Sequence, residues 1–98
     1  MSTLHLVNHS AFTSRVLEEV RHAAQEGDAI MLIEDGVYSA LGADIMPFAP
    51  RVSVYLLTED ARARGLDADG ITSASVRPVD VAGFVNLTAE HDRTLSWS

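Results

Sequence analysis

The stretch Ala29-Ile30-Met31-Leu32-Ile33 is apolar at every position and stops at the polar turn Glu34-Asp35-Gly36. A strand with one face in water would alternate polar and apolar side chains, and this run does not alternate. Both of its faces are therefore predicted to be covered, as in the centre of a parallel sheet that carries helices on its two sides. This one segment points to an α/β fold.

The segment upstream predicts a strand and then an amphipathic helix. Leu4-His5-Leu6-Val7 is short and β-prone, and it ends in the turn-forming cluster Asn8-His9-Ser10. From Thr13 to Gln25, apolar residues recur at three- and four-residue spacing between charged ones, which indicates a helix with one buried face. Thr13 or Ser14 is expected to cap this helix, and Gly27 follows its last turn.

Downstream, the pattern alternates helices and strands again. The predicted elements are a short helix at 37–41, a strand at 52–57, a short helix from Thr58 to Gly65, a weak strand at 75–79, a helix at 80–91, and a tail containing Leu95 and Trp97. Thr58 and Asp80 are the expected helix caps. Pro78 lacks the N–H that an interior strand needs, so its strand is expected at an edge. Val81, Phe84, Val85 and Leu87 are expected to form the buried side of the last helix.

Alternation of strands and helices with short links predicts a three-layer α/β/α fold around a small, mostly parallel sheet. The 98 residues are enough for one hydrophobic core, so we expect a single domain over 1–98. No apolar run approaches the roughly 18 to 20 residues that span a bilayer, and a basic, apolar leader is missing at the start. A cytoplasmic protein without membrane contact is expected.

The charge balance excludes some partners. The chain has 14 Asp and Glu residues against 7 basic ones, all of them Arg, for a formal net charge of −7. Phosphate backbones bind to clustered positive faces, and the densest basic pair, Arg62 with Arg64, adjoins Glu59 and Asp60. We expect no direct nucleic-acid binding; any RNA would be held by a partner.

The chain contains no cysteine. It can therefore form no disulfide and no thiolate metal site, and it can carry no persulfide. No metal or cofactor is expected, and no catalytic residue is assigned.

Polar residues at the ends of the first two strands form the alternative candidate site. Open α/β sheets place ligands at the carboxyl ends of their strands, which makes His9, Glu34 and Asp35 candidates for a small ligand-binding or acid/base enzyme. A simple turn is favoured, because adjacent acids usually point apart and can cap the next helix, with Gly36 supplying an unusual backbone angle. A metal site from His9 and Asp35 has no supporting spacing.

Four ring-bearing side chains are candidates for contact with another subunit: His5, Tyr38, Phe84 and Trp97. His5 lies between two leucines of a predicted strand, so a packed or interface histidine is favoured over a proton carrier. Trp97 has little chain after it to cover it, so docking into a neighbour is favoured over folding back.

Several segments in order resemble the DsrH/TusB family along nearly the whole chain. They are Leu4-His5-Leu6-Val7-Asn8, Ser10 to Phe12, Ile33-Glu34-Asp35-Gly36-Val37-Tyr38, Glu59-Asp60, Ala63-Arg64-Gly65, Val81-Ala82-Gly83-Phe84-Val85 and Ser96-Trp97. The resemblance implies a DsrEFH-like fold.

The resemblance also implies a role. Such chains assemble with DsrE/TusD-like and DsrF/TusC-like subunits into a 2:2:2 heterohexamer that relays persulfide sulfur between donor and acceptor proteins. The sulfur serves either 2-thiouridine formation at the tRNA wobble position or dissimilatory sulfur oxidation, and the essential Cys lies on the DsrE/TusD-like partner. DsrH proteins of the oxidising branch often carry a Cys on the first helix, where this chain has Val20. The expected function is a non-catalytic structural subunit.

Overall fold

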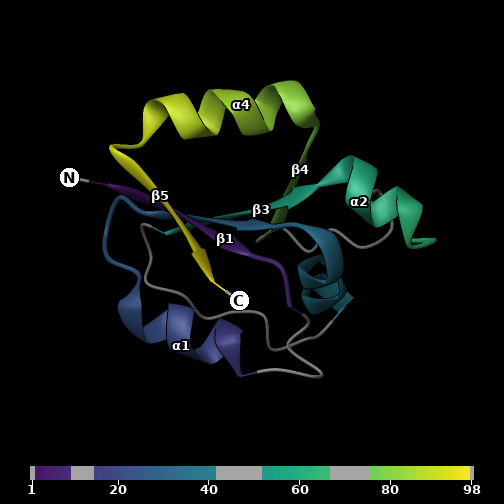
Figure 1. Cartoon of the computed structure of the whole chain (residues 1–98), viewed down its shortest axis with the longest axis horizontal. Coiled ribbons are helices and arrows are strands. Elements are labelled where there is room, and N and C mark those ends of the chain that lie inside the picture. The colour runs from purple at the N-terminus through teal and green to yellow at the C-terminus, as the bar shows by residue number, and fades with distance from the viewer. Residues whose placement is uncertain (1, 10–14, 42–51, 67–75, 98) are drawn as a thin grey trace.

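The computed structural model describes residues 2–9, 15–41, 52–66 and 76–97. Their core is a five-stranded parallel sheet in the order β4-β3-β2-β1-β5 (Figure 1). The elements are β1 Thr3–Val7, α1 Val16–Ala23, β2 Ala29–Leu32, the 3-10 helix η1 Glu34–Leu41, β3 Ser53–Leu57, α2 Thr58–Ala63, β4 Val76–Val79, α4 Val81–Glu90 and β5 Arg93–Trp97. The predicted α/β class and parallel sheet are confirmed.

β2 is the central strand, and all four of its residues are buried. It pairs in parallel with β1 on one side and β3 on the other, so that Ile30 stands between His5 and Val54. This placement explains the unbroken apolar run, because no face of the strand meets water.

The two faces of the sheet have separate apolar cores. One contains Val7, Val20, Ile30, Leu32, Val54 and Leu56, with α1 packed over it; the other contains Leu4, Met31, Leu57 and Leu87, beneath α4. Figure 1 shows α1 and α4 on opposite sides of the sheet, which gives the three layers. None of the helices within the described ranges is long and apolar enough to cross a bilayer.

The helix starts only partly match the sequence prediction. Asp80 caps α4 as expected, since its Oδ1 accepts a hydrogen bond of 2.8 Å from the N–H of Gly83. The prediction for Thr58 is wrong: it is the first residue of α2, and its hydroxyl donates to the Val79 carbonyl at 2.8 Å. The bond joins α2 to β4 and caps nothing. The predicted caps of α1, Thr13 and Ser14, lie outside the described residues.

The turn after β2 also differs from expectation. The left-handed backbone angle falls on Glu34, with φ 49°, and not on Gly36. Gly36 is required for a different reason, because a Cβ there would collide with the carbonyl oxygen of Val7. Glycine thus lets η1 begin directly against the end of β1.

The predicted tail is a strand. β5 pairs in parallel with β1, with Thr3 opposite Arg93 and Val7 opposite Trp97. Four of its five residues are exposed, and its sequence contains no apolar run that would identify it as a strand. The other sheet edge is β4, where Pro78 lies as expected.

Candidate functional site

The strand-end residues lie on the surface, beyond the carboxyl ends of β1 and β2. His9 follows β1, while Glu34 and Asp35 begin η1 after the neighbouring β2, and all three residues are exposed. Among the contacts of the described residues, no hydrogen bond or ion pair joins His9 to either acid. Among the residues described, no group of three or more His, Asp or Glu side chains could hold a metal ion.

Glu34 and Asp35, the two acidic residues after β2, have partners within the fold. Asp35 Oδ1 accepts a hydrogen bond of 2.9 Å from Arg64 Nε, and this bond raises the pKa of the Arg64 guanidinium. The N–H of Glu34 donates to Asp60 Oδ2 at 2.7 Å. Both contacts attach η1 to α2. The choice between a structural turn and an acid/base site at these residues stays a prediction.

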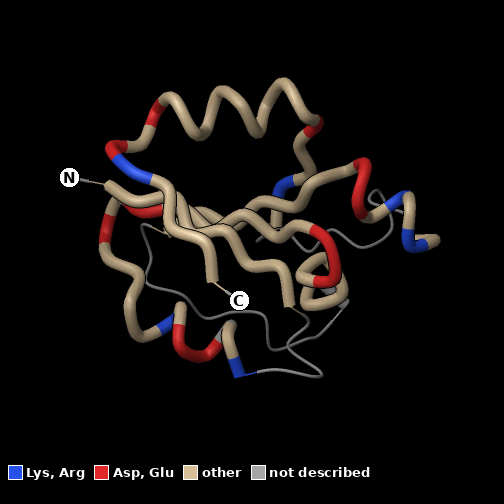
Figure 2. The backbone as a smooth tube through the Cα atoms, viewed as in Figure 1, with Lys and Arg blue, Asp and Glu red and all other residues tan. Residues whose placement is uncertain are grey.

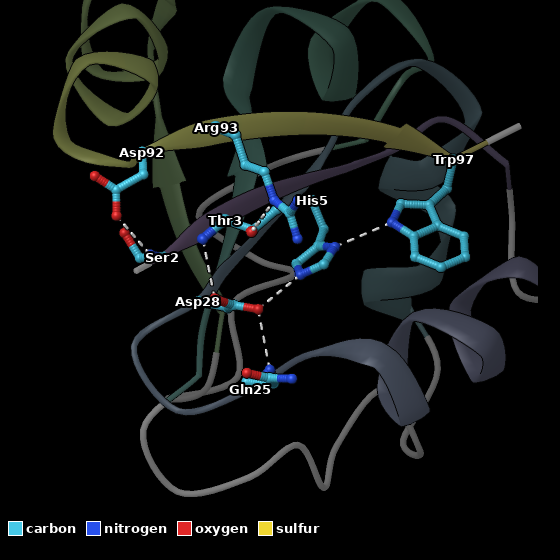
Figure 3. Close-up of polar contacts among 8 residues, drawn as sticks. All are labelled: Ser2, Thr3, His5, Gln25, Asp28, Asp92, Arg93 and Trp97. Carbon is cyan, nitrogen blue, oxygen red and sulfur yellow. Dashed lines mark hydrogen bonds and ion pairs between the residues drawn. The ribbon is translucent and has the colours of Figure 1, made fainter.

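A buried polar network lies on the α1 side of β1 (Figure 3). Its centre is Asp28, the residue just before β2, which is 7% exposed. Its Oδ1 accepts from the N–H of Thr3 at 2.9 Å, and its Oδ2 accepts from the N–H of Gln25 at 3.0 Å and from His5 Nε2 at 2.9 Å. Burial raises the pKa of this carboxyl, but the hydrogen bonds from Gln25, His5 and Thr3 together lower it further, so the net shift is below the ordinary value of 3.8. Asp28 is therefore present in this network as the ionised carboxylate.

Trp97 fixes the protonation of His5. The indole Nε1–H can only donate, and it points at His5 Nδ1 over 3.0 Å, with the two ring centres 6.1 Å apart. Nδ1 must therefore be the bare nitrogen, and the proton sits on Nε2, where it bonds to Asp28. Both ring nitrogens are occupied, and His5 is only 3% exposed.

The arrangement has the His and Asp of a hydrolytic triad without its nucleophile. In such a triad the nitrogen opposite the carboxylate takes a proton from a hydroxyl or thiol. Here that nitrogen faces an indole N–H, which is no nucleophile, and the chain offers no thiol. The contacts instead join β1, the start of β2 and the end of β5.

A cavity of about 430 Å³ opens beside this network, lined by Ser2, Thr3, His5, Ala23, Gln25, Asp28, Asp92, Arg93, Leu95 and Trp97. Its polar groups largely bind one another: Arg93 Nε donates to Thr3 Oγ1 at 3.0 Å, and the N–H of Ser2 donates to Asp92 Oδ2 at 2.8 Å. Part of the polar lining of the cavity is thus engaged in contacts within the chain.

Comparison with known proteins decides the family. The model of the family described as "DsrH like protein" matches residues 9–94. The chain belongs to the DsrH-like family. Protein TusB of Pectobacterium parmentieri is 37% identical over 97 residues, covering 96% of this chain and 99% of the relative. Protein TusB of Escherichia fergusonii is 40% identical over 76 residues, covering 74% and 77%.

The DsrH-like chain also has a structural relative. The solution NMR structure of protein Tm0979 from Thermotoga maritima superposes with a TM-score of 0.70 at 26% identity, covering 90% of this chain and 92% of that one. The DsrEFH-like fold and the family resemblance are both confirmed. Val20, which stands where the resemblance places a thiol in some relatives, is fully buried on α1.

The four ring-bearing candidates occupy different environments in this DsrH-like chain. His5 is inside the fold, and Trp97 is partly buried against the core on the α1 side. Phe84 is partly buried against the core beneath α4, and Tyr38 is partly buried in η1. Their role in subunit contact stays a prediction.

Val81 and Val85 were expected on the buried side of α4, and this prediction is wrong. They are 50% and 58% exposed, and Leu87 is the buried residue of the helix. A signal was available, because no residue from Val81 to Ala89 is charged, and the helix therefore has no charged side to turn toward water.

Proposed function

We propose that this DsrH-like chain is a non-catalytic structural subunit of a sulfurtransferase complex. In this proposal it assembles in the cytoplasm with DsrE/TusD-like and DsrF/TusC-like subunits as a 2:2:2 heterohexamer. The relatives named TusB favour the branch that thiolates wobble uridine in tRNA over dissimilatory sulfur oxidation.

The observation that carries the proposal is the absence of cysteine in a member of this family. A persulfide is a sulfur atom bound to a thiol sulfur, so a chain without a thiol cannot hold the relayed atom in that form. The closed network of His5, Asp28 and Trp97 supports the same conclusion, because its one histidine has no free nitrogen with which to move a proton. The chain then contributes shape to the site at which a partner's Cys receives sulfur.

Co-expression with the two sister subunits from the same genome tests the proposal. Native mass spectrometry should find this chain in a complex with both sisters. After exposure to a persulfide donor, intact-mass analysis should find added sulfur on a sister subunit and none on this chain. A stable monomer that ignores both sisters, or sulfur carried by the lone chain, would overturn the proposal.

Variants at the strand ends separate this function from the acid/base alternative. Replacement of His9, Glu34 and Asp35 by Ala should leave sulfur transfer through the assembled complex nearly unchanged, because all three side chains are exposed and the contact of Asp35 is an ion pair with Arg64 of the same chain. Abolished transfer with assembly intact would favour the enzyme interpretation.

A further inference from the structure

The outer face of α4 differs from that of an ordinary surface helix. Its exposed residues are Val81, Ala82, Val85, Asn86, Ala89 and Glu90, and only the last is charged. Val81, Val85 and Ala89 follow one another at four-residue spacing and so form one stripe. The outer side of α1, in contrast, carries Glu18, Glu19 and His22. A helix that is apolar on both its inner and outer sides is typical of one buried by a further layer.

Carboxylates border this stripe at both ends. At the start of α4, Asp80 caps the helix and Glu59 Oε2 accepts from the N–H of Val81 at 3.3 Å. At the other end lie Glu90 and Asp92, both exposed. Figure 2 shows acidic residues at each end of α4 and uncharged residues between them. Arg93, next to Asp92, donates instead to Thr3 on the opposite face of the sheet.

The acidic residues at the two ends of the stripe indicate whether this face binds a second copy of the chain or a different protein. Two copies related by a two-fold axis would place their α4 helices either antiparallel or parallel, depending on the direction of the axis. Because both ends of α4 carry carboxylates, acidic residues of one copy would face acidic residues of its neighbour at both ends of the contact in either arrangement. Like charges brought together across an interface are unfavourable, so self-association through this face is disfavoured.

We infer that the outer face of α4 docks a sister subunit of the complex, through an apolar patch on that subunit bordered by Lys or Arg side chains. This inference rests on the proposed function and assigns the surface through which it is carried out. Val81 and Val85 supply the apolar contact. The carboxylates at the two ends of the helix set the orientation of the docked subunit and increase the rate at which the two subunits associate.

Two variants on α4 and two matched variants on α1 test the inference. Val85→Asp places a charge in the apolar stripe, and Glu90→Lys reverses one border charge; both side chains are exposed, so the fold should tolerate the changes. His22→Asp and Glu19→Lys make the same kinds of change on the outer side of α1. Affinity for the purified sister subunits is measured by calorimetry, after circular dichroism has shown that each variant is folded.

Val85→Asp should weaken binding at least about tenfold, since the lost burial of one valine alone is worth about that factor. Glu90→Lys should weaken it less, by a few fold, and should reduce its dependence on salt. The two α1 variants should bind like the wild type.

Each contrary result has a distinct meaning. If the wild type binds the sisters and both α4 variants bind equally well, the docking face is wrong while the proposed function stands. If the lone chain is a dimer that Val85→Asp dissociates, the choice of partner is wrong. If the wild type binds neither sister, the proposed function and this inference both fail.

Discussion

Asp28 is the residue on which the polar interior depends. It is the common acceptor for Thr3 and His5, which both lie on β1, and for Gln25, which lies between α1 and β2. Replacement by Asn should lower the free energy of unfolding by about 2 kcal/mol, because hydrogen bonds to a buried charged group are lost and donors are left facing an amide NH2. Asp35→Asn is the control: it breaks an exposed ion pair and should cost less than about 1 kcal/mol. Urea unfolding measures both, and equal costs would contradict the ranking.

The stability difference between the wild type and Asp28→Asn should depend on pH. Because the pKa of Asp28 is lower in the folded chain than its ordinary value of 3.8, folding is favoured by ionisation of this carboxyl. Its contribution is fully present above that ordinary value and is lost as the pH falls through the folded-state pKa. The stability difference between wild type and Asp28→Asn should therefore be constant near neutral pH and shrink in acid. A difference that grows on acidification would show that the sign is wrong.

At the scale of elements, the sequence predicted those that carry a local signal. The unbroken apolar run of β2, the three- and four-residue apolar spacing of α1 and the Asp80 cap of α4 are such signals, and each of these elements is confirmed. β5 was missed because an edge strand with exposed residues needs no apolar pattern. The network at the candidate site was missed because its contacts join residues 23 and 92 positions apart, and no local pattern records such pairs.

β5 is held to the sheet at its end by Trp97. Trp97→Phe keeps much of the apolar contact but removes the N–H, so His5 Nδ1 loses its donor and the chain should lose about 1 kcal/mol. Trp97→Ala also loses the ring and should cost about 3 kcal/mol. In both variants hydrogen exchange should accelerate in β5 before it does in β2 and β3. Leu95→Ala, a change at a 42% exposed side chain of the same strand, should have little effect.

If β5 of the folded Trp97→Ala variant exchanged as slowly as in the wild type, the backbone pairing with β1 alone would hold the strand. That result would leave Trp97 available for contact with another subunit, as the sequence suggested.

The net negative charge of the chain limits the classes of molecule that it can bind directly. The chain has twice as many acidic residues as basic ones, and no lysine. The arginines of the described residues lie at separate places in the chain: Arg64 pairs with Asp35, while Arg15 and Arg21 belong to α1 and its cap, beside the acids Glu18 and Glu19. Figure 2 shows acidic residues interspersed among the basic ones on that helix. A nucleic acid backbone would meet a net repulsive field on approach.

The lone chain should therefore show no saturable binding to tRNA in fluorescence anisotropy, even at low salt, where electrostatic attraction to phosphate is strongest. The comparison is the assembled complex: if the complex binds tRNA, the binding belongs to a sister subunit, because adding this acidic chain supplies no phosphate-binding group. Binding by the lone chain that weakens as salt is raised would mean that the few arginines act together after all. The conclusion that this subunit does not contact RNA would then be wrong, and so would the conclusion that its role is purely structural.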